Sequence, residues 1–227
     1  MKPQRHAALS RLLGLYPPYA EEFGIDLATP AGRFKWFVAS LLFGAPIGGA
    51  IVAATYRRLD EAGVLASPKA LEAAGWDRLV ALLDSGGYVR YDFSTATKLL
   101  DIAARLAKDY GDLEALRAAS ADGAELESRL REFKGIGPAT AGIFLRELRG
   151  PWRIEREPCE VAAGAAARLG IDLGKHEGED LTRAEAALVQ LHLRRCKKGT
   201  CGDCEFAAGC DPEGRPGKAP PSGGSRR

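Results

Sequence analysis

The sequence predicts an all-α protein. Alanine, leucine, arginine and glutamate dominate it, runs of β-branched residues are scarce, and apolar residues recur at three- and four-residue intervals. These intervals mark one face of an α-helix, whereas a half-buried strand would alternate at every second residue. With 227 residues, of which 46% are hydrophobic, the chain can bury the core of one or two compact domains.

Glycine and proline divide the first half of the chain into short helices. A helix over residues 7–16 is stopped by Pro17-Pro18, and an apolar helix begins near Phe34 and ends at about Gly44. The other segments of this half with helical periodicity are 47–62, 67–74, 76–83, 95–110, 112–119 and 124–133, and glycines mark most of the turns between them.

The second half continues the helical pattern. A helix from Ala139 to about Leu148 is followed by the breaker Gly150-Pro151, and the next helix runs from about Pro158 to Leu169, where Gly170 closes it. The spacing Thr182-x-x-Glu185 is typical of a capping box, which predicts a further helix from Thr182 to Arg195.

Charge and hydropathy limit the function classes. Lys and Arg number 32 against 30 Asp and Glu, so a net charge of +2 does not by itself indicate a polyanionic partner, and any nucleic-acid site must be local. The most apolar run, 37–54, is broken by Ser40, Pro46 and glycines, short of the roughly 18 to 20 apolar residues of a membrane span.

The two ends of the chain carry no structural signal of their own. Residues 1–10 lack the apolar stretch of a signal peptide, so we expect a cytoplasmic protein with no membrane partner. Residues 211–227 are rich in Gly, Pro, Ser and Arg, a composition that cannot build a core and predicts a disordered tail.

Four of the five cysteines fall within fifteen residues, in the pattern C-x4-C-x2-C-x5-C. They are Cys196, Cys201, Cys204 and Cys210. A secreted disulfide scaffold would spread its cysteines along the chain, whereas this spacing allows four thiolates to bind one centre. The pattern predicts a metal site, either a [4Fe-4S] cluster or tetrahedral zinc.

Residues 133–141 read FKGIGPATA and lie between two helical patterns. Two glycines one residue apart allow a tight turn with exposed amides, and the next helix directs its N-terminus to the same place, which favours a bound anion. The candidate phosphate contacts are Lys134, Gly135, Ile136, Gly137, Ala139 and Thr140. The alternative is an ordinary glycine turn between core helices.

From Gly135 onward this segment resembles the hairpin of the helix-hairpin-helix DNA glycosylases, the group of endonuclease III and the adenine-mismatch and alkylation-repair enzymes. The cysteines resemble the C-terminal cluster loop of endonuclease III, although the first gap here is two residues shorter. The resemblance covers about residues 34–210 and favours the [4Fe-4S] cluster over zinc. It implies a six-helix barrel domain at 34–145 and a cluster-bearing helical domain formed by 1–33 and 146–210.

The resemblance also implies a function and a partner. Members of this superfamily flip a damaged or mismatched base out of double-stranded DNA and cleave its N-glycosidic bond. We therefore expect a monomeric base-excision-repair enzyme, located in the cytoplasm at the nucleoid. Arg194, Lys197 and Lys198 beside the cysteines would contact DNA phosphates, or are solvated charges at a helix end.

The family's catalytic residues are not found at their expected positions. Bifunctional members use a lysine just past the hairpin glycines, where this chain has Ala139, so we expect a monofunctional enzyme. The family's aspartate belongs in the stretch 154–161, which contains none. Ungapped counting puts Cys159 in its place, whereas a helix that starts at Pro158 makes Glu157 the cap. Glu157 is the first candidate carboxylate and Glu160 the second.

A further loop, residues 86–93, resembles the Gly-x-Tyr loop of the family but is longer. Its aromatic side chains could stack on a base or pack into the core. Asp92 in this loop is the third candidate carboxylate. Because the expected lysine and aspartate are missing, and a glutamine of the apolar helix is also absent from residues 41–46, a catalytically inactive DNA-binding or lesion-sensing protein is the alternative function.

Overall fold

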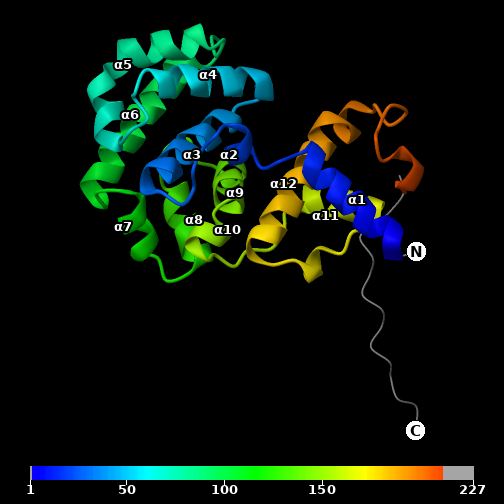
Figure 1. Ribbon diagram of the computed structural model, residues 1–227. Helices are drawn as coiled ribbons and strands as arrows, with labels where there is room; N and C mark the ends of the chain where they lie inside the picture. Colours follow the sequence, from blue (N-terminus) through cyan, green and yellow to red (C-terminus); the bar gives the residue numbers. More distant parts are fainter. Residues whose placement is uncertain (1, 212–227) are drawn as a thin grey trace. The chain divides into compact units, whose positions relative to one another are not determined.

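The computed structural model describes residues 2–211, with side chains from residue 8 onward (Figure 1). Throughout this range the chain is all-helical and contains no β-strand, which confirms the predicted all-α class. Apart from Asp211, the tail predicted for 211–227 lies outside the described residues. The chain divides into two compact units, Pro18–Arg156, called the central unit, and Met1–Pro17 with Glu157–Arg227, called the terminal unit.

The central unit is built from nine helices among its residues 18–156. These are α2 (Tyr19–Glu22), α3 (Pro30–Phe43), α4 (Gly49–Glu61), α5 (Pro68–Ser85), α6 (Asp92–Asp109), α7 (Leu113–Ala118), α8 (Gly123–Arg131), α9 (Pro138–Arg146) and α10 (Arg149–Trp152). The predicted pair 67–74 and 76–83 corresponds to the two halves of α5, which Gly75 separates with a φ of 74°.

Side-chain caps place several of these helix starts. The Thr29 hydroxyl accepts a hydrogen bond from the Gly32 amide at 3.0 Å, and Pro30 occupies the first position of α3. The helix therefore begins before Phe34, where the apolar pattern alone placed it. Asp112 and Asp122 cap α7 and α8 in the same way.

The predicted breaker Gly150-Pro151 is wrong, because both residues lie inside the one-turn helix α10. Proline is tolerated there since the amides of a first helical turn have no intrahelical acceptor. The helix ends instead at Arg153, which adopts a left-handed conformation with a φ of 50°.

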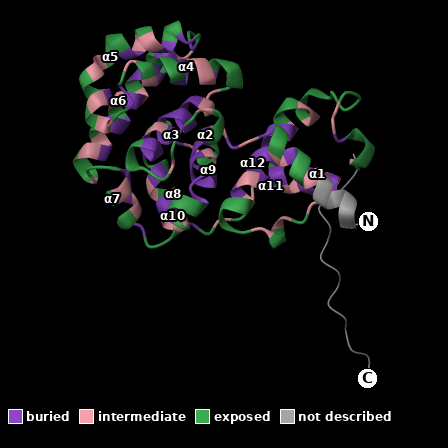
Figure 2. Cartoon of the chain, viewed as in Figure 1, coloured by how far each residue is buried: buried purple, intermediate pink, exposed green. Residues whose placement is uncertain are grey.

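The core of the central unit is centred on α3, most of which is buried (Figure 2). Trp36 is fully buried, and its indole Nε1 donates to the Phe144 carbonyl at 3.1 Å. The rings of Phe37 and Phe144 meet edge to face with centroids 5.1 Å apart. Helices α3 and α9 are thus joined by apolar packing and by a hydrogen bond that satisfies the one polar group of a buried indole.

A buried carboxylate fixes the entry to the central unit. Glu147 is 2% exposed, and its two carboxylate oxygens accept hydrogen bonds from the backbone amides of Tyr19 at 3.0 Å and Ala20 at 2.8 Å. A residue distant in the sequence therefore caps the N-terminus of α2. Burial raises the pKa of Glu147 to about 7. The Tyr19 ring also packs on Phe43, with centroids 4.5 Å apart. These contacts attach the segment after Pro18 to the central unit, whereas the sequence-based boundary lay at residue 34.

The terminal unit combines three helices, α1 (Lys2–Leu15), α11 (Glu160–Leu169) and α12 (Gly178–Arg194), with the short 3-10 turns η1 (Leu173–Lys175), η2 (Cys196–Lys198) and η3 (Ala207–Gly209). Leu12, Ala162, Ala187 and Leu188 form the centre of its core. Gly170 closes α11 with a φ of 65°, as predicted.

The predicted capping box at Thr182 is wrong, because α12 begins one turn earlier, at Gly178. The Thr182 hydroxyl donates to the Gly178 carbonyl at 3.0 Å inside the helix. Glu185, 2% exposed, accepts the Cys159 amide at 3.0 Å. The two side chains of the expected capping box thus bond elsewhere, one to a carbonyl inside the helix and one to the amide of a distant residue.

None of the helices in the described part of the chain combines the length and the apolar character that crossing a membrane requires.

The raised pKa of Glu147 predicts a pH-dependent stability. The folded protein holds this proton more tightly than the unfolded chain, whose glutamate pKa is near 4.5. The free energy of unfolding should therefore fall, by about 3 kcal/mol, as the pH rises from about 4.5 to about 7. Glu147→Gln cannot titrate and should lack this component, as measured by urea unfolding across that pH range. Parallel pH profiles of the two proteins would contradict the assignment.

Candidate nucleic-acid interface and cysteine centre

The segment between α8 and α9 forms a tight turn. Gly135 has a φ of 93°, a left-handed conformation that favours glycine, and the Ile136 amide donates to the Phe133 carbonyl at 3.0 Å. Ile136 is buried at 4% exposure and holds the turn against the core. Lys134 is exposed, with its Nζ 3.7 Å from the Asp101 carboxylate. The turn thus presents backbone and one lysine to solvent.

Helix α9 begins at this turn without a side-chain cap. Gly137 occupies the cap position, Pro138 follows it, and no side chain accepts the first amides of the helix. Ala139 is exposed, whereas Thr140 is buried and its hydroxyl packs against Gly44, where an added Cβ would lie 2.4 Å away. An uncapped helix N-terminus is a favourable place for an anion. Of the six predicted contacts, Ile136 and Thr140 have side chains that face the core.

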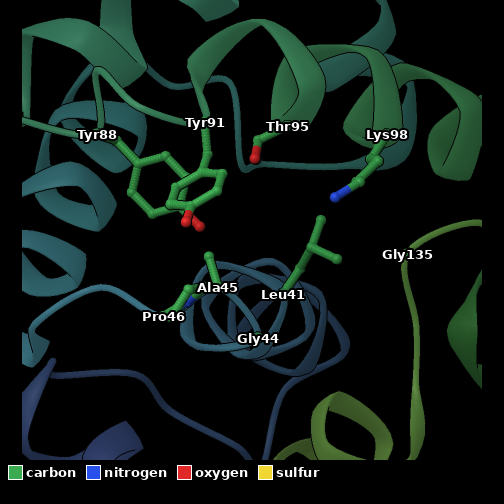
Figure 3. Close-up of a pocket in the computed structure, with 9 residues that line it drawn as sticks. All are labelled: Leu41, Gly44, Ala45, Pro46, Tyr88, Tyr91, Thr95, Lys98 and Gly135. Atoms are coloured by element: carbon green, nitrogen blue, oxygen red, sulfur yellow. The ribbon is translucent and has the colours of Figure 1, made fainter.

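A pocket of about 170 Å³ lies beside the turn (Figure 3). Its lining comes from the end of α3, from the 86–91 loop, from α6 and from the turn itself. The lining residues are Leu41, Gly44, Ala45, Pro46, Tyr88, Tyr91, Thr95, Lys98 and Gly135. Sequence reasoning missed this pocket, because its parts are far apart in the chain and only the fold assembles them.

The aromatic residues of the 86–93 loop divide between core and surface. Tyr88 is fully buried, and its hydroxyl donates to the Leu42 carbonyl at 2.9 Å. Burial raises the pKa of Tyr88 to about 12, a shift that a hydrogen bond with Thr95 opposes. Phe93 is 61% exposed, and the centroid of its ring lies 5.4 Å from the centroid of the Trp76 ring. Core packing therefore accounts for Tyr88, whereas Tyr91 is half-buried and Phe93 is largely exposed.

Asp92, the third candidate carboxylate, is the first residue of α6. It is 9% exposed, and its Oδ1 accepts the Phe93 amide at 2.7 Å. A carboxylate at a helix N-terminus is stabilised by the helix dipole and by the free amides of the first turn, which accounts for Asp92 without a catalytic role.

The four clustered cysteines follow α12 in the terminal unit. Cys196 begins η2, Cys201 is exposed, and Cys204 and Cys210 pack against the core of the unit. The loop is held at several points: Arg195 pairs with Glu205, and the Asp211 amide donates to the Arg168 carbonyl at 2.8 Å. Phe206 is buried beneath the loop at 6% exposure.

The neighbouring charges shift the pKa of two of the four thiols. Burial raises the pKa of Cys210, and the charges of the other three cysteines raise it further. Burial likewise raises the pKa of Cys196, whereas the Arg168 guanidinium lowers the pKa of both thiols. Arg168 Nε is buried and has no hydrogen-bond acceptor. Among the described side chains, those of residues 8–211, however, no three from His, Cys, Asp or Glu form a group that could hold a metal ion.

The predicted basic contacts beside the cysteines differ in their surroundings. Lys197 and Lys198 are exposed on η2. Arg194 ends α12, and its guanidinium lies 5.5 Å from the centroid of the Tyr16 ring. All three predicted cations are exposed, and Arg194 differs from the two lysines in its contact with an aromatic ring.

The start of α11 shows which residue caps this helix. The helix begins at Glu160, and Cys159 occupies the cap position, so the alternative in which Pro158 opens the helix and Glu157 caps it is wrong. The Cys159 side chain makes no capping hydrogen bond, and its amide is bound by Glu185. Glu157 and Glu160 are both exposed. They belong to the terminal unit, whereas Asp92 and the glycine turn belong to the central unit.

Neither the protein-family models nor the curated proteins compared with this chain gave a match.

The turn geometry predicts unequal effects of two glycine substitutions. Gly135→Ala forces a non-glycine residue into a φ of 93° and places a Cβ 2.8 Å from the Lys98 side chain. It should lower the free energy of unfolding by more than about 1 kcal/mol, as measured by urea titration. Gly137→Ala is the matched control, because its φ is −90° and nothing lies within 4 Å of the added Cβ. Equal effects of the two substitutions would argue against strain at Gly135.

Proposed function

We propose that this protein is a base-excision-repair DNA glycosylase of the helix-hairpin-helix superfamily, with a six-helix barrel domain and a cluster-bearing domain. The turn between α8 and α9 carries the proposal. Its left-handed Gly135 and its uncapped helix start are the features that a phosphate-binding hairpin needs, and they occur in the segment that resembles the family motif. The partner would be double-stranded DNA at the nucleoid, bound by a monomer.

Affinity in such an interface comes from local groups. Backbone amides and the positive end of the α9 dipole attract phosphate without a large net charge, in keeping with a formal charge of only +2. The exposed Lys134, Lys197 and Lys198 would add phosphate contacts that are weakened by salt.

The cysteines are proposed to hold a [4Fe-4S] cluster, with zinc as the alternative. Four thiols supply the ligand number of either centre. The surroundings of the thiols suit an anionic centre. The positive charge of Arg168 lowers the pKa of Cys196 and Cys210, and the buried Arg168 Nε–H has no hydrogen-bond acceptor. The cluster would order the basic loop beside DNA, a structural role that leaves bond cleavage to other residues.

The proposed reaction is hydrolysis without a Schiff base. Ala139 stands where a nucleophilic lysine is expected, so water would attack the sugar C1′, the N-glycosidic bond would break, and the base would leave with a proton. Glu157 would accept the proton of the water and stabilise the cationic sugar, with Glu160 and then Asp92 as alternatives. The departing base would take up a proton from solvent, and the carboxyl group would return the water proton to solvent, which restores the carboxylate.

A second candidate function is a DNA-binding or lesion-sensing protein without catalysis. One observation favours it: the cap of α11, where relatives carry their aspartate, is Cys159, a residue unable to supply a carboxylate. Such a protein would bind abasic or mismatched duplex and convert no substrate.

The metal proposal predicts a coloured protein. Anaerobically purified protein should absorb broadly in the visible range and contain about four irons per chain. Cys204→Ser should remove most of this absorption, whereas Cys159→Ser, outside the cluster pattern, should leave it unchanged. A colourless protein that contains one zinc ion would establish the alternative centre.

The proposed hydrolysis leaves an intact abasic site, so the DNA strand should break only when alkali is added. In a single-turnover assay on a panel of lesion-containing duplexes, an enzyme without lyase activity should give strand breaks only after alkaline treatment, and borohydride should trap no covalent adduct. Glu157→Gln should lower the rate at least about a hundredfold, as expected for a general base. Glu155→Gln, an exposed neighbour, is the control.

The same assay separates the two functions. Tight binding to an abasic analogue with no breaks on any duplex would support the non-catalytic protein. A trapped adduct would contradict the hydrolytic route.

A further inference from the structure

The pocket beside the glycine turn has the composition of a site for a small planar ligand. Leu41, Ala45 and Pro46 form an apolar wall, and the tyrosines of the 86–91 loop form another. Its volume of about 170 Å³ is below the range of roughly 300–1,000 Å³ typical of drug-sized ligands, and suits a single ring system.

One cation enters this apolar surrounding. Lys98 extends from α6, and its amine points into the space between Thr95 and Leu41 (Figure 3). Its aliphatic stem packs on Gly135, because an added Cβ there would lie 2.8 Å from the Lys98 Cδ. Across residues 8–211 no ion pair or hydrogen bond involves the Lys98 amine. The turn therefore positions a cationic donor whose hydrogen-bonding capacity is unused.

Among the other polar side chains of the pocket, those of Tyr88 and Thr95 have partners within the protein, whereas the Tyr91 hydroxyl makes no hydrogen bond to the described residues. The Tyr88 hydroxyl donates to Leu42, and a hydrogen bond with Thr95 acts on the same tyrosine. Phosphate recognition usually takes several converging N–H donors. A pocket with one ammonium group and mostly apolar or aromatic walls fits the edge and faces of a heterocycle better than it fits a phosphate.

We propose that this pocket binds one nucleobase by its keto edge, with the Lys98 ammonium donating to a carbonyl oxygen and the neighbouring ring nitrogen. This inference rests on the proposed function, which supplies a flipped base, and names its substrate class. Lysine suits the O6 and N7 acceptors of a 6-keto purine, whereas the amino group of adenine presents a donor to the same position. The pocket thus selects keto bases over amino bases.

The discriminating probes are free hypoxanthine and adenine, which differ in carrying an oxygen or an amino group at C6. Saturation-transfer NMR titrations of the full-length protein should give an affinity at least about tenfold higher for hypoxanthine. Lys98→Met keeps the stem against Gly135 and removes the donors, so it should reduce hypoxanthine affinity to that of adenine. Lys98→Arg keeps a cationic donor and should retain the preference.

Lys108→Met is the matched control, since Lys108 is exposed on the same helix and outside the pocket. Urea unfolding of each variant verifies that it is folded. Equal affinity for the two bases, no binding of either, or an unchanged preference in Lys98→Met would overturn the inference. Displacement of hypoxanthine by equimolar inorganic phosphate would identify an anion site instead, and would also overturn it.

The titration contains no DNA, so it is independent of the repair assay. Binding of hypoxanthine through Lys98 together with no excision on any duplex would refute the glycosylase and retain the keto-base pocket. If the protein excises a base and Lys98→Met leaves the preference for hypoxanthine unchanged, the glycosylase is supported and the keto-base pocket is refuted.

Discussion

The contact between α3 and α9 is the constraint on which the central unit depends. Trp36 can be fully buried only because Phe144 accepts its indole N–H, and the Phe37 and Phe144 rings extend the same contact. The position of α9 in turn determines which contacts form at its two ends. The glycine turn is held at its N-terminus, and Glu147, just past its C-terminus, binds the amides that start α2.

The same packing brings together groups that are distant in sequence. Thr140 of α9 lies against Gly44, where a larger residue would not fit, so the end of α3 comes close to the turn. Lys98 reaches the turn from α6 because Gly135 has no side chain to exclude it. The glycines of this region therefore serve close approach as well as backbone conformation. A turn and a pocket result from one set of contacts.

The sequence predicted those features whose causes are local. Gly75 and Gly170 interrupt or close helices because their left-handed backbone is a property of the residue itself, and both positions were predicted correctly. Thr182 and Glu185 satisfied a local pattern, yet Glu185 is bound to the Cys159 amide across the terminal unit, and α12 starts elsewhere. Composition and periodicity contain no information on such partners. The pocket was missed for the same reason, since Lys98 becomes noteworthy only beside Gly135.

The terminal unit is assembled from two segments, residues 1–17 and the chain after Glu157, with the whole central unit between them. Its core joins Leu12 to Leu188, so α1 leaves the ribosome long before the helices that bury it exist. The central unit is contiguous and can fold first during synthesis, and its folding brings its two ends closer together than in an extended chain. Until then α1 has no core to join, and that interval is when a chaperone or a nascent-chain protease would meet it.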